Sequence, residues 1–130
     1  MKTTLLQVGL VAAGGAVGSV ARFLVATWGG GIWGTRFPWG TLLVNLAGCF
    51  AIGVFAALSV KLRWMSAPLW CLLVPGFAGG FTTFSSFGLE TFQLLRQQAW
   101  IPAGSYVSAS LIGGLLFLWL GYALVPPFRG

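Results

Sequence analysis

The chain has 130 residues, of which 58% are hydrophobic and 6% are charged, and its formal net charge is +6. Soluble domains carry about 25% charged residues, so this composition indicates an all-α integral membrane protein with one transmembrane domain, residues 1–130. The chain has no His and a single acid, Glu90, which argues against zinc sites, acid–base pairs and nucleophile triads and therefore against an enzyme.

Two features of composition leave alternatives open. The basic residues are scattered and mostly flank apolar runs, so they either anchor the chain to lipid headgroups or reflect the handling of anions. Cys49 and Cys71 both lie in apolar segments without a CxxC motif, and we interpret them as free apolar fillers.

The first predicted span covers residues 8–28, long enough to cross the hydrocarbon core. Gly14 and Gly18 form a small-xxx-small pair, which favours close helix packing. Arg22 lies inside this span and has two interpretations: it snorkels to the interface, or it supplies positive potential near an anion route. Residues 29–40 are rich in Gly and Trp and predict a loop.

The second predicted span covers residues 41–60, with Thr41 at its N-cap or in its first turn. Asn45 follows one turn later. An Asn in a membrane helix either binds a neighbouring helix or, in a sharper interpretation, donates its amide hydrogens to a permeating anion. Both interpretations remain open for Asn45.

The third predicted span, residues 69–95, is poor material for a plain membrane helix. Its centre contains Pro75, which lacks a backbone donor, and the helix-weakening residues Gly76, Gly79 and Gly80. A broken helix at membrane depth is tolerated where it lines a water-filled cavity or binds something. The sequence therefore predicts a third helix broken near its middle, at a functional site.

Hydroxyls and aromatic rings follow the predicted break. If the helix resumes after the glycines, its period places Thr83, Ser86 and Glu90 on one face. Phe84 and Phe87 form a neighbouring stripe, which serves either packing or the site.

Residues 97–105 predict a loop, and the last span is expected over residues 106–125. Four spans put both termini on one side of the membrane. That side carries Lys2, Lys61, Arg63 and Arg129, against Arg36 and Arg96 on the other. This small bias orients the chain weakly or allows both orientations. Because no internal repeat is visible, any symmetry must come from a second copy.

Three blocks of sequence resemble the small fluoride channels of the Fluc or CrcB family. These blocks are GGAVGSVAR at 14–22, PWGTLLVNLAG at 38–48 and GFAGGFTTFSSFGLE at 76–90. The last is the most specific, and the fourth span matches more loosely. The resemblance implies a dual-topology homodimer of antiparallel chains with two fluoride pores and a central structural Na⁺. It also implies fluoride export from the cytoplasm across the bacterial inner membrane, which relieves toxicity.

The resemblance also implies the site residues. Backbone carbonyls at the positions of Gly79 and Thr82 hold the Na⁺ in the family. Arg22 and Glu90 are assigned electrostatic roles. Gly114 departs from the family pattern, because many members have a hydroxyl residue there. The implied anion pore comprises Asn45, Thr83, Phe84, Ser85, Ser86, Phe87, Tyr106 and Ser110.

The chemistry of these residues suits fluoride, which only accepts hydrogen bonds and therefore needs donors to replace its water. A small multidrug exporter is one alternative, but it requires an acid deep in the membrane. A non-transporting assembly protein, in which the glycines serve packing alone, is another. A fluoride-flux assay separates all three.

Overall fold

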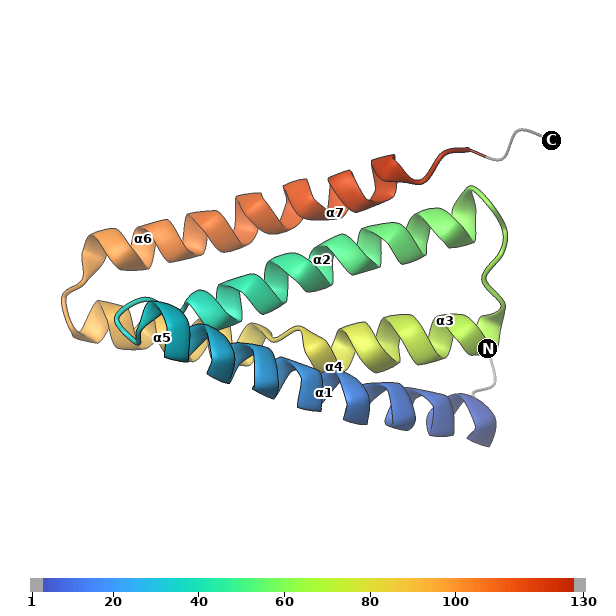
Figure 1. Cartoon of the computed structure of the whole chain (residues 1–130), viewed down its shortest axis with the longest axis horizontal. Coiled ribbons are helices and arrows are strands. Elements are labelled where there is room, and N and C mark those ends of the chain that lie inside the picture. The colour runs from blue at the N-terminus through green and yellow to red at the C-terminus, as the bar shows by residue number, and fades with distance from the viewer. Residues whose placement is uncertain (1–3, 128–130) are drawn as a thin grey trace.

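The computed structural model describes residues 4–127, and every regular element in that range is helical. Four helical stretches are long and apolar enough to cross a membrane: Leu5–Trp33, Trp39–Val60, Ala67–Arg96 and Trp100–Leu124. Figure 1 shows them side by side, with the first turn of α1 and the last turn of α7 at the same end. The prediction of four membrane-spanning helices is confirmed. Lys2 and Arg129, used in the charge comparison, lie outside the described residues.

Helix α1 (Leu5–Trp33) is longer than the predicted span at both ends. Its start is fixed by a capping box, in which the Thr4 hydroxyl accepts from the Gln7 backbone and the Gln7 side chain accepts from the Thr4 backbone. The predicted loop over 29–40 is wrong in its first part, because the chain stays helical to Trp33. A β-carbon on Gly29 would lie 2.9 Å from the α-carbon of Gly40. This glycine therefore serves close contact with α2 and does not form a turn.

Helix α2 (Trp39–Val60) lies between α1 and α7 (Gly114–Leu124). Thr41 lies in the first turn of α2, as expected. Two glycines let α2 and α7 approach closely: a β-carbon on Gly53 would lie 2.9 Å from the Leu118 carbonyl carbon, and one on Gly121 would lie 3.1 Å from that of Phe50. The α2–α7 pair consequently packs backbone against backbone.

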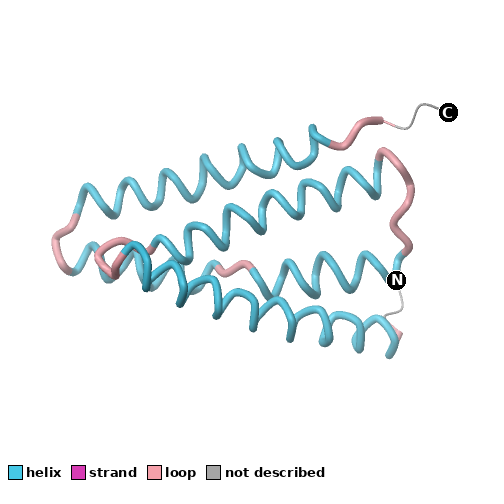
Figure 2. Tube along the Cα trace, in the orientation of Figure 1, coloured by secondary structure: helices cyan, strands magenta, loops and turns pink. Residues whose placement is uncertain are grey.

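The third span consists of four helical pieces separated by one break. They are α3 (Ala67–Cys71), a π-helical segment (Leu72–Ala78), α4 (Gly79–Phe81) and α5 (Phe84–Arg96). Thr82 and Thr83 between α4 and α5 are extended, with ψ of 159° and 124° (Figure 2). The predicted break in the third helix is confirmed.

The break does not lie at the proline and glycines that suggested it. Pro75 sits in the π-helical segment, where the helix is locally wider, and the chain remains helical through Gly79 and Gly80. Gly76 and Gly80 instead serve contact with α1. A β-carbon on Gly80 would lie 2.9 Å from the α-carbon of Gly15, and one on Gly18 would lie 2.9 Å from the Phe81 nitrogen. Close packing at Gly18 is confirmed.

The fourth span begins earlier than predicted. Helix α6 covers Trp100–Ser108, and a π-helical segment, Ala109–Gly113, joins it to α7. The predicted loop over 97–105 is therefore wrong beyond Ala99. Pro102 lies in the first turn of α6, where a missing N–H costs the helix nothing, so it does not prevent helix formation.

Candidate functional site

The break in the third helix is held by Asn45 of α2. Its Nδ2 donates to the Thr83 carbonyl at 3.0 Å, and the Thr83 backbone N–H donates to its Oδ1 at 2.9 Å. A primary amide has two N–H donors, and only one of them is used here. Asn45 therefore binds a neighbouring helical segment and keeps a second hydrogen available for another acceptor.

The hydrogen bonds at the break leave two carbonyls without their helical donors. In a continuous helix the Gly79 carbonyl would accept from Thr83 N–H, and the Thr82 carbonyl would accept from Ser86 N–H. Here Thr83 N–H donates to Asn45, and Ser86 N–H donates to the Thr83 hydroxyl at 3.1 Å, which caps α5. The two oxygens implied as metal ligands are therefore among those released by the break.

Arg22 reaches the break from α1. Its Nε donates to the Gly80 carbonyl at 3.1 Å, and the Ser19 hydroxyl lies 3.5 Å from the same oxygen. The guanidinium is thus turned toward the third span and does not extend along α1 to a lipid headgroup. Arg22 thus supplies a donor to the Gly80 carbonyl, one of the carbonyls left without a helical partner at the end of α4.

A groove of about 250 Å³ opens beside the break. The Ser110 Oγ is buried and has no hydrogen-bond partner among residues 4–127. Since the groove also contains the Asn45 amide, it collects donors at the depth where the third helix is interrupted. Its lining residues are Asn45, Cys49, Ile52, Thr82, Thr83, Phe84, Phe87, Ser110 and Leu111.

The phenylalanines of the third span divide into two groups. The Phe84 side chain is 82% exposed in the single chain, and its ring centroid lies 5.7 Å from that of Phe87. In turn, the centroid of the Phe87 ring lies 5.2 Å from that of the Tyr106 ring. Phe81, by contrast, is buried and stacks on Phe77 at 5.6 Å. Phe84 and Phe87 line the groove, whereas Phe81 packs between helices.

Three predicted pore residues do not line this groove. Ser85 is exposed and its hydroxyl lies 3.3 Å from that of Thr83, which donates to the Ser86 hydroxyl at 3.2 Å. Tyr106 is fully buried, and its hydroxyl donates to Glu90 Oε2 at 2.6 Å. The structure thus places Ser85 and Ser86 next to the groove and Tyr106 behind Phe87.

Glu90 accepts hydrogen bonds on both carboxylate oxygens, because the Thr41 hydroxyl donates to Oε1 at 2.7 Å. The single acid of the chain therefore joins α2, α5 and α6. Because both oxygens have donors, the desolvation cost of the charge is partly offset.

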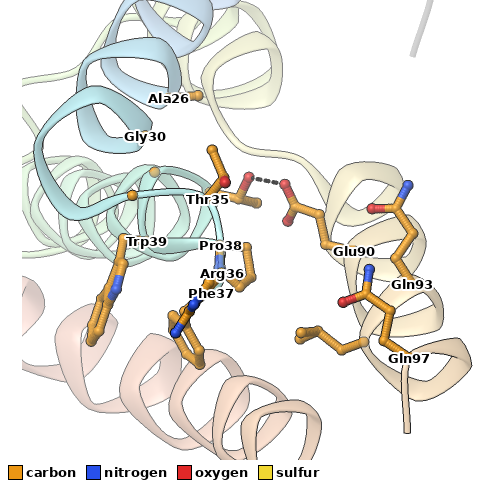
Figure 3. Close-up of a pocket in the computed structure, with 14 residues that line it drawn as sticks. Ala26, Gly30, Thr35, Arg36, Phe37, Pro38, Trp39, Glu90, Gln93 and Gln97 are labelled. Carbon is orange, nitrogen blue, oxygen red and sulfur yellow. Dashed lines mark hydrogen bonds between the residues drawn. The ribbon is translucent and has the colours of Figure 1, made fainter. Parts of the chain in front are cut away.

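A second cavity of about 270 Å³ lies between the α1–α2 loop and α5. Figure 3 shows Glu90 and Gln93 of α5, with Gln97 just after its end, across from the loop segment that contains Arg36. The dashed line marks the hydrogen bond to Glu90. This polar cavity begins where the Thr41–Glu90–Tyr106 cluster ends.

Sequence reasoning missed several residues of these two cavities. Cys49 lies four residues after Asn45 and so shares its helix face. Gln93 and Gln97 lie three and seven residues after Glu90, on the face predicted for the hydroxyls. The helical period alone was the signal available for all three. Among the described residues, no cluster of three or more His, Cys, Asp or Glu offers a side-chain metal site.

Comparisons with known proteins agree with this geometry. Residues 9–122 match the family model described as "CrcB-like protein, Camphor Resistance (CrcB)". The chain is 44% identical over 121 residues to the "Fluoride-specific ion channel FluC" of Rhizobium etli, covering 93% of this chain and 97% of that one. It is 43% identical over 119 residues to the protein of the same name from Leptospira interrogans, covering 92% and 94%.

A third relative, from Chloroflexus aurantiacus, has the same name and is 40% identical over 120 residues, covering 92% of this chain and 95% of its own. All three relatives are named as ion channels, in agreement with the expectation that the chain is not an enzyme. The matched range, residues 9–122, includes most of α1, the whole of the break and most of α7. The chain therefore belongs to the CrcB-like, or Fluc, family of membrane proteins.

Proposed function

We propose that this chain forms a fluoride-selective channel, which exports fluoride from the bacterial cytoplasm across the inner membrane and relieves its toxicity. The observation that carries the proposal is the Asn45 amide, which is fixed at the break and retains one unused hydrogen in a groove lined by Ser110 and two phenylalanines. The names of the FluC relatives support the same function.

The groove suits a small anion that only accepts hydrogen bonds. The Asn45 amide and the Ser110 hydroxyl supply donors, and the edges of the Phe84 and Phe87 rings carry the positive end of the aromatic quadrupole. Among residues 4–127, no cationic side chain lines the groove, and the Arg22 guanidinium is bound to the Gly80 carbonyl. Such neutral donors bind weakly enough for an ion to leave, as conduction requires.

Fluoride efflux from liposomes containing the purified chain tests this function. A fluoride electrode should record passive efflux, and chloride-loaded liposomes should release little. A multidrug exporter would instead couple the movement of cationic drugs to protons, and an assembly protein would move neither. Absence of fluoride efflux from a folded, reconstituted protein contradicts the proposal.

The active unit in this proposal is an antiparallel homodimer with two pores. In a single chain, Phe84 is 82% exposed and the Ser85 hydroxyl is also exposed near the middle of the third span. Exposing the Ser85 hydroxyl and the groove with the Asn45 amide to lipid would be energetically costly. We therefore expect a second copy of the chain to cover them. Two copies contribute two grooves, and therefore two pores.

Both orientations of the chain should occur in one membrane. In a variant with Cys49 and Cys71 replaced by Ser and one cysteine added at the C-terminal tail, an impermeant thiol reagent should label about half of the chains from either side. The physical reason is the small difference in basic residues between the two ends. Labelling from one side only contradicts dual topology.

The proposal includes a Na⁺ ion held at the dimer centre by the carbonyls of Gly79 and Thr82. Both oxygens lack the donors that a continuous helix would supply, as described above. Pairing two chains about a twofold axis would bring four such oxygens together. Ca²⁺ and Mg²⁺ usually recruit carboxylates, and the described residues supply no carboxylate cluster for such an ion. The neutral carbonyl ligands therefore favour a monovalent cation. Bound there, the ion would join the two chains.

Exchange of Na⁺ for a large organic cation should lower dimer stability and fluoride flux together, with no sodium flux accompanying fluoride. Because the ligands are backbone atoms, Thr82→Ala should keep the ion, whereas Gly79→Val should disturb it through the backbone. Thermal unfolding and efflux in matched buffers measure both effects. Unchanged flux from protein shown to be free of Na⁺ removes the ion from the proposal.

The phenylalanines provide an internal comparison. Phe84→Ala and Phe87→Ala should each lower fluoride flux more than Phe81→Ala, since only the first two rings line the groove. Phe81→Ala should instead lower stability, by about 3 kcal/mol for a buried aromatic residue. Efflux and thermal unfolding on the same three variants check this. Equal losses of flux would mean that all three rings serve packing.

A further inference from the structure

We propose that Cys49 forms a second donor level in the anion groove, one helical turn from Asn45, and that Gly114 makes room for its thiol. This inference rests on the proposed fluoride channel and adds a residue to its permeation path. The thiol would take part in the replacement of water around the anion as it leaves the Asn45 amide.

The position of Cys49 follows from helix geometry. Asn45 and Cys49 are four residues apart on α2, which puts their side chains on one face, and both line the groove beside the break. Ser110 lines the same groove from the fourth span, and its buried hydroxyl has no partner among residues 4–127. A polar atom left in this state in a membrane helix indicates that water or an ion completes its hydrogen bonding.

Gly114 of α7 lies opposite Cys49 of α2 where the two helices are in contact. A β-carbon built on Gly114 would lie 3.3 Å from Cys49 Sγ, a distance that forces one of the two groups to move. The absence of a side chain at Gly114 therefore leaves the thiol its place beside the groove. Cys49 is a free cysteine, is only partly buried and lines the groove.

The chemistry of a thiol suits this place. The S–H group is a weak donor, weaker than the amide of Asn45 or the hydroxyl of Ser110. A gradient from a stronger to a weaker donor lets an anion advance without being held, which conduction requires. A hydroxyl at the same place would bind at least as well.

A comparison of alanine and serine at two positions tests this. Cys49→Ser keeps a donor and should retain wild-type fluoride flux, whereas Cys49→Ala should lower flux about fivefold for the loss of one donor. The matched pair Cys71→Ser and Cys71→Ala should show equal flux, because Cys71 does not line the groove. Dimer size on gel filtration verifies folding. Equal flux in the two Cys49 variants overturns the proposal.

A second measurement does not depend on the mutations at Cys49. In a Cys71→Ala background, methyl methanethiosulfonate reacts when the thiolate attacks its sulfenyl sulfur and displaces methanesulfinate, giving a mixed disulfide. Mass spectrometry should find Cys49 modified, and fluoride flux should be blocked and then restored by dithiothreitol. Modified protein with unchanged flux, or folded protein whose Cys49 stays unmodified, overturns the proposal.

These readouts separate the inference from the function on which it rests. If the wild-type chain moves no fluoride in liposomes, the proposed function fails whatever Cys49 does. If the wild-type chain moves fluoride and the Cys49 variants behave like the Cys71 variants, only the inference fails.

Discussion

Asn45→Asp is expected to reduce fluoride flux at least about a hundredfold, the scale set by hydrogen bonds to charged groups of up to 3 kcal/mol. The carboxylate still accepts from the Thr83 N–H, but it loses the donor to the Thr83 carbonyl and the second amide hydrogen that we propose for the anion. Its negative charge also repels the anion. Efflux from liposomes measures the loss.

The control for this change is Gln98→Glu, which makes the same exchange of amide for carboxylate at an exposed loop residue. Its flux should equal that of the wild type. Because Thr83 N–H keeps an acceptor in Asn45→Asp, the proposed dimer should remain folded on gel filtration. Wild-type flux in a folded Asn45→Asp dimer would remove Asn45 from the anion path.

Gly18→Ala is expected to destabilise the chain by about 3 kcal/mol, the upper end of the usual cost of overpacking. The new β-carbon would lie 2.9 Å from the Phe81 nitrogen, and a backbone atom cannot move aside as a flexible side chain would. Displacement of α1 would also pull Arg22 from the Gly80 carbonyl at the break. Thermal unfolding in detergent measures the change.

Gly9→Ala is the matched control, because it lies on the same helix and a β-carbon there meets nothing within 4 Å. It should unfold at or above the wild-type temperature, since alanine favours the helix by about 1 kcal/mol. Similar losses in the two variants would mean that helix propensity or the partner chain, and not contact with α4, decides the outcome.

The case of Asn45 explains how far sequence reasoning reached. It offered two roles, binding to a neighbouring helix and donation to an anion. The structure shows the first role, since one amide hydrogen binds the Thr83 carbonyl, while the second role stays a prediction. The two roles are compatible because a primary amide has two N–H donors. Composition and spacing therefore could not decide between them.

The sequence by itself determined that four apolar helices cross the membrane and that the third is interrupted. Hydropathy and length are local properties, and lipid leaves no other regular structure open to such segments. The sequence also identified candidate site residues near the interruption. Hydroxyl and amide groups at membrane depth are energetically costly unless they take part in hydrogen bonding or function.

The tertiary structure alone decided where the interruption lies and which residues share the groove. Pro75 and the glycines looked like the break, but contact with α1 keeps that stretch helical. The chain opens at Thr82 and Thr83 because the Asn45 amide donates to the Thr83 carbonyl and accepts from the Thr83 N–H. The pairing of Cys49 with Gly114 depends likewise on how α2 crosses α7. Such contacts join residues far apart in the chain, so no local pattern encodes them.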